Sequence, residues 1–253
     1  MTKLVNHILM LLLVCLSNTS QAQNRMRPVE ELVNVPHPGW MYVQQLIDYA
    51  KNKVEILSCD TLRAKEALYK SQVDIHSPMG AIIYGTGGLL VDGGWIRILG
   101  SGSSKLDRTL PDWNKEKSLK EFGEQPGFLL IADDAVGGFF ALNGGELGKD
   151  LGNVYYLSPD NLKWRPLGQT YFDFLLFCLR GDLNEFYKGF RWNNWEEEVR
   201  SLDGNQVYNF TPCLWTKEGK DINKNERKII NVEEQYALNI NSRKQLGLDK
   251  KKN

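Results

Sequence analysis

The sequence predicts one α+β domain, residues 27–240, in which helices at both ends of the chain flank an antiparallel meander of β-hairpins. Apolar residues recur at helical spacing before residue 70 and again after residue 170. Between these regions, short apolar runs alternate with turn sequences. No internal repeat or long linker divides the sequence, so the segregated helices and strands indicate a single α+β domain.

The first part of this domain is expected to be helical. Residues 25–34 form a short helix that ends at the Pro-His-Pro-Gly turn of residues 36–39, and residues 40–51 place apolar residues on one face of a second helix. Residues 53–58 are typical of a short strand. A third helix spans residues 60–69, where the aspartate and the threonine at its start are both candidates for the N-cap.

Three β-hairpins are expected in the centre of the chain. The first spans residues 89–99. It is expected to bend at its Asp-Gly pair, because a type I′ turn needs positive φ at both central positions. The second spans residues 127–142 and the third spans residues 154–167. Pro166 cannot donate a ladder hydrogen bond, so it places the last strand at a sheet edge or a strand end.

Helical periodicity returns beyond residue 170. Helices are expected at residues 172–179, 183–187, 192–202 and from about Glu233, and short strands at residues 207–210 and 229–232. Residues 241–253 are a lysine-rich tail.

The first 22 residues predict a signal peptide. Lys3 precedes a nine-residue apolar run, residues 8–16, which is too short for a bilayer that needs roughly 20 residues. Ser20 and Ala22 then supply small residues three and one positions before Gln23, the pattern of a signal peptidase site. A buried N-terminal helix is the alternative. We expect export and cleavage near Ala22, which leaves a periplasmic or secreted protein without a membrane span.

Residues 85–105 contain seven glycines and one lysine, which raises the question of a phosphate-binding loop. A P-loop needs GxxxxGK[ST], but Lys105 is preceded by Ser103 and Ser104. The dinucleotide pattern GxGxxG also fails, and both templates need a strand before the loop and a helix after it. The sequence therefore implies no cofactor. The glycines are interpreted as turn and strand-boundary residues: Gly87, Gly88, Gly93 and Gly94.

Charge and cysteine content exclude further classes of protein. Removal of Lys3 with the signal peptide reduces the 31 basic residues to 30, against 31 acidic residues, so nucleic-acid binding has little electrostatic support. The three cysteines of the mature chain are widely spaced and form no CxxC pattern, so no zinc site is indicated. The spacing leaves open whether two of Cys59, Cys178 and Cys213 form a disulfide.

Asp133 and Asp134 form an obvious carboxylate pair at the expected bend of the second hairpin, and Asp92 lies at the bend of the first. Paired carboxylates can bind a divalent cation or share acid and base roles, so these three are the catalytic candidates. Adjacent aspartates also favour turns, because their side chains hydrogen-bond to nearby backbone. The histidines show no metal-ligand spacing, so no metal site is assigned.

Aromatic residues are concentrated in the second half of the chain. Within the sequence RWNNW, Trp192, Asn194 and Trp195 are candidates for an exposed recognition patch, because interfaces are enriched in tryptophan and arginine. Core packing is the alternative, since a domain of this size needs bulky apolar residues against its sheet.

Several sequence blocks follow one another in a specific order: NVPHPGW, SPMGAIIYGTGGLLVDGGWIRILGSG, GFLLIADDAVGGFFALNGG, LGNVYYLSPDNLKWRPLG, YFDFLLFCLRGDLNEFYKGFRW and PCLWT. Together they resemble the DUF2625 family of bacterial proteins of unknown function, over residues 27 to about 238. The layout of the third, fourth and fifth blocks is also similar to the Smi1/Knr4-like (SUKH) superfamily. That resemblance implies an α+β fold and a protein partner, because the superfamily includes many immunity proteins that bind toxins. Neither resemblance implies catalytic residues.

Three functions remain open at this point. A non-enzymatic protein-interaction module, immunity-like if the second resemblance extends to function, is favoured because the sequence shows no catalytic constellation. An envelope hydrolase would use Asp133, Asp134 or Asp92, with or without a metal ion. A small-ligand or glycan-binding module would use exposed tryptophans.

Overall fold

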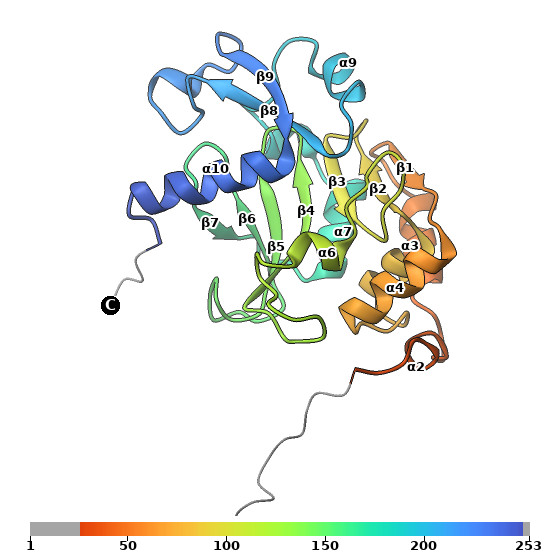
Figure 1. Cartoon of the computed structure of the whole chain (residues 1–253). Helices are drawn as coiled ribbons and strands as arrows, with labels where there is room; N and C mark the ends of the chain where they lie inside the picture. The colour runs from red at the N-terminus through yellow and green to blue at the C-terminus, as the bar shows by residue number, and fades with distance from the viewer. Residues whose placement is uncertain (1–25, 250–253) are drawn as a thin grey trace, which may run out of the picture.

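The computed structural model describes residues 26–249 (Figure 1). The expected signal peptide, residues 1–22, lies outside the described residues, as do residues 250–253 of the lysine-rich tail. In the described part of the chain, no helix combines the length and apolar character that crossing a membrane requires.

A seven-stranded antiparallel sheet forms the centre of the fold, and its strands lie side by side in chain order (Figure 1). They are β1 (Val54–Leu57), β2 (Gly88–Val91), β3 (Ile96–Leu99), β4 (Phe128–Asp134), β5 (Phe139–Asn143), β6 (Val154–Leu157) and β7 (Trp164–Pro166). The three hairpins expected from the sequence are confirmed as the pairs β2–β3, β4–β5 and β6–β7. Pro166 lies in the edge strand β7, as predicted.

The α+β class is confirmed by the helices that surround this sheet. They are α2 (Val29–Val33), α3 (Trp40–Asp48), α4 (Thr61–Ser71), α5 (Pro78–Gly85), α6 (Leu110–Asn114), α7 (Tyr171–Arg180), α8 (Leu183–Phe186), α9 (Trp195–Arg200) and α10 (Val232–Gln245). Asp60 caps α4 by accepting a hydrogen bond from the backbone N–H of Arg63 at 2.9 Å, and a capping box of Thr170 and Asp173 starts α7.

The two faces of the sheet carry different side chains. Arg97 is paired with Asp133 across β3 and β4, and Asp133 is paired with Phe139 across β4 and β5. Directly paired residues project to the same side, which we call the front face because it is nearer the viewer in Figure 1. The next residues, Asp134 and Phe140, project to the opposite side, the back face.

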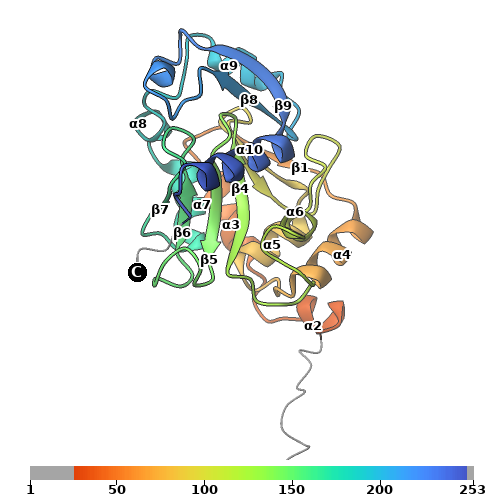
Figure 2. The same cartoon turned by 60° about the vertical axis from the view of Figure 1, so that its left-hand side comes forward.

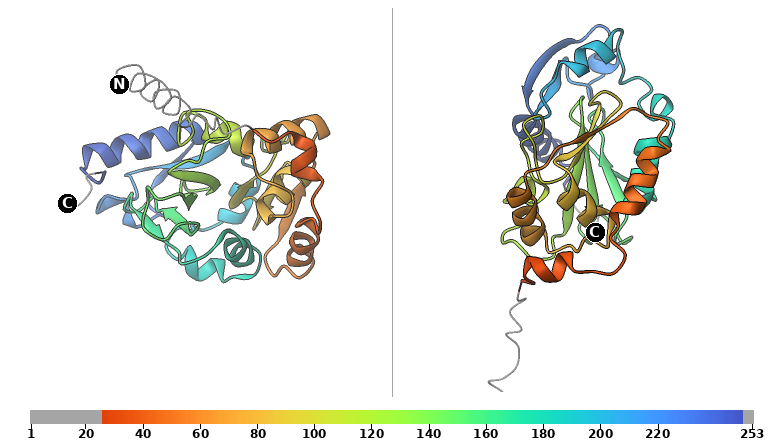
Figure 3. Two further views of the ribbon diagram at one scale, coloured as in Figure 1. Left: turned by 90° about the horizontal axis from the view of Figure 1, so that it is seen from below. Right: turned by 90° about the vertical axis from the view of Figure 1, so that its right-hand side faces the viewer.

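Helices cover both faces of the sheet. On the front face, α10 places Tyr236 against Phe139, with ring centroids 5.0 Å apart. On the back face, α7 places Phe174 against Phe140, with ring centroids 4.9 Å apart. The right-hand view of Figure 3 shows the sheet nearly edge-on between these helical layers.

A smaller sheet of two antiparallel strands, β8 (Gln206–Thr211) and β9 (Glu226–Asn231), lies at one end of the main sheet together with α9 (Figure 2). The backbone N–H of Tyr208 donates to the carbonyl of Ala135 at 2.9 Å, which joins β8 to the bend of the β4–β5 hairpin. The strands expected near residues 207–210 and 229–232 are therefore confirmed, and they pair with each other.

Two helices lie where the sequence did not predict them. The helix α5 lies in a segment where apolar runs alternate with glycine and for which no helix was expected. Ser77 caps it by accepting a hydrogen bond from the backbone N–H of Gly80 at 3.0 Å, and Pro78 lies in its first turn. Most residues of α5 are buried, so its sequence lacks the alternation of apolar and polar faces that reveals a surface helix. The helix α6, capped by Thr109, lies within the stretch 101–126 that was expected to be a polar loop.

The hairpin bends agree only partly with expectation. Asp92, Gly93 and Gly94 have φ values of 53°, 71° and 92°, so the first hairpin bends where the sequence predicts. Asp133 and Asp134, in contrast, are the last residues of β4 and lie before the bend. Of the glycines interpreted as turn or boundary residues, Gly88 is the first residue of β2, and Gly87 lies directly before it.

Candidate functional site

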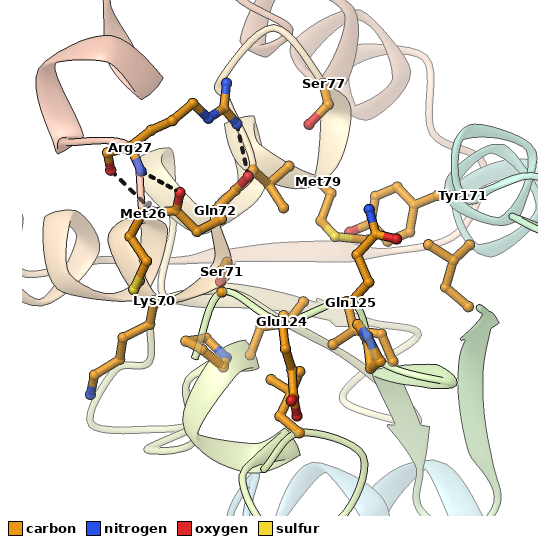
Figure 4. Close-up of a pocket in the computed structure, with 18 of the residues that line it drawn as sticks. Met26, Arg27, Lys70, Ser71, Gln72, Ser77, Met79, Glu124, Gln125 and Tyr171 are labelled. Atoms are coloured by element: carbon orange, nitrogen blue, oxygen red, sulfur yellow. Dashed lines mark hydrogen bonds between the residues drawn. The ribbon is translucent and has the colours of Figure 1, made fainter. Parts of the chain in front are cut away.

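A pocket of about 690 Å³ lies where the first described residues and helices α4 to α7 meet the sheet (Figure 4). Its wall is largely apolar and includes Met26, Met79, Leu110, Leu129, Leu142 and Phe172. We call it the apolar pocket. Leu129 and Leu142 are cross-strand partners in β4 and β5, so the sheet itself supplies one wall.

Tyr171, the first residue of α7, lines the apolar pocket. Figure 4 shows its ring extending from α7 toward Met79, with the side chain of Gln125 nearby. The residue is 8% exposed, and its hydroxyl has no hydrogen-bond partner in the structure. Burial raises the pKa of Tyr171 above its ordinary value, so the hydroxyl stays protonated. It is therefore a buried hydrogen-bond donor that a bound molecule can satisfy.

The polar groups at the opposite wall are already engaged. The backbone N–H of Arg27 donates to Oε1 of Gln72 at 2.7 Å, and its guanidinium donates to the Gln72 carbonyl at 2.8 Å, as the dashed lines of Figure 4 show. Nζ of Lys70 lies 2.8 Å from carboxylate oxygens of both Glu66 and Asp112. Among the described residues that line the apolar pocket, Tyr171 is therefore the one whose buried polar atom has no hydrogen-bond partner.

A second pocket, of about 760 Å³, lies over the front face of β1 to β3. Arg97 lines it and is only 1% exposed. The surrounding charged side chains are Lys53, Lys105 and Arg200, which are cationic, and Glu55 and Asp203, which are anionic. We call it the basic pocket. No residue lines both this pocket and the apolar pocket.

Asp133, on the same face, binds two arginines. Its Oδ1 accepts a hydrogen bond from Nε of Arg97 at 2.7 Å, and its Oδ2 lies 2.5 Å from Nη1 of Arg108. Asp133 is fully buried, and Nη1 of Arg97 has no hydrogen-bond partner in the structure. Arg108 also donates to the carbonyl of Gly204 at 2.8 Å and stacks on Trp113 at 4.5 Å. Burial lowers the pKa of Arg108, although Asp133 opposes this change.

Asp134, on the back face, is equally buried and accepts four hydrogen bonds. The backbone N–H groups of Val136 and Gly138 donate to its Oδ1 at 3.1 and 2.8 Å. The hydroxyls of Tyr156 and Tyr187 donate to its Oδ2 at 2.7 and 3.2 Å. Burial raises the pKa of Asp134 and of both tyrosines. This carboxyl group thus links the hairpin bend to β6 and to the end of α8.

The third carboxylate candidate, Asp92, forms an ion pair with Arg191. The guanidinium of Arg191 stacks on Trp95 and Trp195 at 4.9 and 4.0 Å from the ring centroids. Trp195 in turn packs edge-on against Trp95, with ring centroids 4.9 Å apart. The bend of the first hairpin is therefore tied to the segment before α9.

The residues of the proposed recognition patch have different environments. Trp192 is 2% exposed and packs against Tyr208 with ring centroids 5.1 Å apart, so it belongs to the core. Asn194 is exposed, with φ of 65°, and Trp195 is half-buried. Trp195 lines a pocket of about 220 Å³ together with Asp92 and Gly93. The structure brings these three together and places Asp133 and Asp134 elsewhere.

Other reactive side chains do not gather into a site. Within residues 26–249, no three His, Cys, Asp or Glu side chains are placed to share a metal ion. Among the described residues, Cys59, Cys178 and Cys213 form no disulfide, and burial raises the pKa of Cys178 well above its ordinary value. His76 contacts the carbonyls of Pro36 and His37 at 3.1 Å through Nδ1.

Three residues important to these pockets were not singled out from the sequence. Arg97 had a detectable signal, because it is a lone charged residue within the apolar run WIRIL of a predicted strand. Arg108 lies in a polar stretch where nothing distinguishes it, and Tyr171 resembles any other aromatic residue at the start of a helix.

The chain is similar to other proteins over most of its length. The model of a family described as "Protein of unknown function DUF2625" matches residues 29–235. An "Uncharacterized protein" of Haemophilus influenzae is 47% identical over 206 residues, which is 81% of this chain and 90% of that protein. The "Putative uncharacterized protein YbfG" of Escherichia coli is 41% identical over 206 residues, 81% of this chain and 92% of that protein. No solved structure matches the chain significantly.

Proposed function

The chain belongs to the DUF2625 family, and on that premise we propose that it is an exported, non-enzymatic binding protein that holds a small apolar molecule in the apolar pocket. The observation that carries this proposal is the Tyr171 hydroxyl, which is buried and unpartnered in the wall of that pocket. A buried hydroxyl without a partner costs about 1–3 kcal/mol, and a ligand that accepts its hydrogen bond removes that cost.

The size and lining of the apolar pocket suit a small molecule. Ligand sites in proteins have volumes of roughly 300–1,000 Å³ and apolar walls with few polar groups. The apolar pocket, at about 690 Å³, falls within this range. Its occupant would be an apolar molecule that carries one hydrogen-bond acceptor beside Tyr171.

The environments of the carboxylates favour binding over hydrolysis. Asp133 is held by Arg97 and Arg108, Asp134 by four hydrogen-bond donors, and Asp92 by Arg191. A general acid or nucleophile needs access to substrate, and Asp133 and Asp134 are 0% exposed. The hydrolase hypothesis therefore has less support than ligand binding.

The geometry also favours the binding of a small ligand over the binding of a protein partner through the patch of Trp192, Asn194 and Trp195. Trp192, the first residue of that patch, is buried, and hot-spot residues must be available to the partner. An immunity-like role would have to use another surface.

Titration with Nile red tests this proposal, because this neutral apolar dye carries a carbonyl acceptor and fluoresces in apolar surroundings. We expect saturable binding to the wild-type protein. Leu142→Trp, which adds volume inside the apolar pocket, should abolish it. Tyr171→Phe should weaken it about fivefold, the equivalent of about 1 kcal/mol for one hydrogen bond.

Leu238→Trp is the matched control, because Leu238 is 41% exposed on α10 and does not line the pocket. It should bind Nile red as the wild type does. Binding that is unsaturable, or that is equal in Leu142→Trp and Leu238→Trp, would show that the dye does not enter the apolar pocket and would refute the proposal.

A further inference from the structure

The arginines on the front face outnumber the acidic groups that can balance them. Arg97 and Arg108 share the carboxylate of Asp133, and Glu233, whose charge also acts on Arg108, is ion-paired with Lys117 at 2.9 Å, so this cluster carries one excess positive charge. Asp134 lies on the back face and is engaged with Tyr156 and Tyr187. A buried charge without a counter-charge is costly, so the cluster favours an anion nearby.

The excess charge lies at the basic pocket. Arg97 lines that pocket and is 1% exposed, and its Nη1 makes no hydrogen bond within residues 26–249. Nε donates a hydrogen bond to Oδ1 of Asp133 at 2.7 Å, and Nη2 lies 2.5 Å from the same oxygen without hydrogen-bond geometry. Among the described residues, Nη1 has neither a hydrogen bond nor an ion pair, so it is the nitrogen left for a further acceptor. An oxyanion in the pocket would supply that acceptor.

The remaining charges of the basic pocket reinforce this excess. Lys105 and Glu55 pair with each other at 2.5 Å, and Asp203 accepts hydrogen bonds from Asn205. Lys53 has no ion pair among the described residues. The ion pair of Arg200 is a long one, with 3.9 Å between its Nη2 and a carboxylate oxygen of the exposed Glu196. Four cationic and two anionic side chains therefore line the pocket.

We propose that the basic pocket binds the phosphate group of a small organic phosphate, with Arg97 and Lys53 as its ligands. Arginine presents planar donors to phosphate oxygens, and lysine acts as a point charge. The net positive lining matches a dianion.

The space in the basic pocket supports an organic phosphate rather than the bare ion. A volume of about 760 Å³ far exceeds that of one ion. Val54, Leu90 and Leu202 add apolar wall for the organic part. At Gly93 and Gly94, an added Cβ would meet no atom within 4 Å, so the hairpin bend leaves this side open. This site is separate from the proposed ligand site, because the two pockets share no lining residue.

Calorimetric titration at constant ionic strength tests the proposal, with inorganic phosphate and phenyl phosphate as probes and chloride as the reference. We expect both phosphates to bind the full-length protein with a stoichiometry of about one, phenyl phosphate more tightly. Lys53→Gln, an exposed substitution, should weaken binding of both about tenfold. Arg97→Met should weaken it further, since it removes the buried donor and leaves Asp133 paired with Arg108.

Lys188→Gln is the control, because Lys188 is exposed and lies outside the basic pocket. It should bind both probes as the wild type does, and all variants should bind Nile red unchanged, which separates this site from the apolar pocket. Absence of phosphate binding at millimolar concentration would overturn the proposal. Equal binding by Lys53→Gln and the wild type would also overturn it, as would binding of inorganic phosphate with exclusion of phenyl phosphate.

Discussion

Asp133 and Asp134 are adjacent in β4, are both fully buried, and project to opposite faces of the main sheet. Asp133 faces Arg97 and Arg108 on the front face, whereas Asp134 faces two tyrosine hydroxyls on the back face. The pair therefore does not act as a unit. One carboxylate balances buried cations, and the other organises hydrogen-bond donors.

The first prediction concerns Asp133. Asp133→Asn should lower the free energy of unfolding by about 3 kcal/mol or more, because the guanidinium groups of Arg97 and Arg108 then lose their shared ion-pair partner. Arg97→Met should cost less, since Asp133 and Arg108 remain a one-to-one pair. Urea unfolding at pH 7 measures both. A larger loss in Arg97→Met than in Asp133→Asn would contradict the charge balance inferred for this cluster.

The second prediction concerns pH and Asp134. Burial raises the pKa of Asp134 in the folded protein above that of the unfolded chain. The stability from this group is therefore complete below the unfolded pKa and is lost as the pH rises through the folded pKa. The free energy of unfolding falls by about 1.4 kcal/mol for each pH unit between the two pKa values. Asp134→Asn cannot ionise and avoids this loss.

Urea unfolding of the wild type and Asp134→Asn from pH 4 to pH 8 measures this effect. The stability of Asp134→Asn relative to the wild type should increase as the pH rises. Asp107→Asn, at an exposed carboxylate, is the control and should show no comparable trend. A constant difference between Asp134→Asn and the wild type across this range would show that Asp134 keeps the same pKa on folding.

The third prediction compares two buried tyrosines. Tyr171→Phe removes an unpartnered hydroxyl, so the ligand-free protein should keep its stability or gain up to about 1 kcal/mol. Tyr156→Phe removes the 2.7 Å hydrogen bond to Asp134 and should cost about 1.5 kcal/mol or more. Thermal or urea unfolding distinguishes them. A marked loss of stability in Tyr171→Phe would mean that its hydroxyl has a partner in the ligand-free protein.

Local sequence predicted the main sheet because turn chemistry is local. The Asp-Gly pair at Asp92 predicts a bend in its own segment, and Pro166 predicts an edge strand in its own segment. The structure agrees with both predictions. The helix α5 escaped prediction because its burial on most sides removes the amphipathic pattern. Adjacent aspartates suggested a turn at Asp133, yet the strand continues through them because Arg97 is paired with Asp133 across the sheet.

The pockets could not be predicted from the sequence because they depend on long-range contacts. Asp133 is fully buried because Arg97 and Arg108 reach it from separate segments of the chain. Tyr171 and Arg97 each have a hydrogen-bond donor without a partner, and this can be recognised only from the positions of all surrounding described residues. The turn glycines and aromatics were visible in the sequence, but their exposure was not, as the burial of Trp192 shows.

The last prediction concerns export. The predicted cleavage near Ala22 would leave Gln23 as the first residue, ahead of Arg27 and its contacts with Gln72. A chain cleaved there would keep the wall of the apolar pocket, which begins at Met26. When the full-length protein is expressed in a Gram-negative host, we expect periplasmic material whose intact mass corresponds to residues 23–253.

Leu12→Arg interrupts the apolar run and should leave uncleaved protein in the cytoplasm. Leu62→Arg, at a residue 76% exposed on α4, should be exported like the wild type. Uncleaved wild-type protein in the cytoplasm would exclude the signal peptide and, with it, the export component of the proposed function.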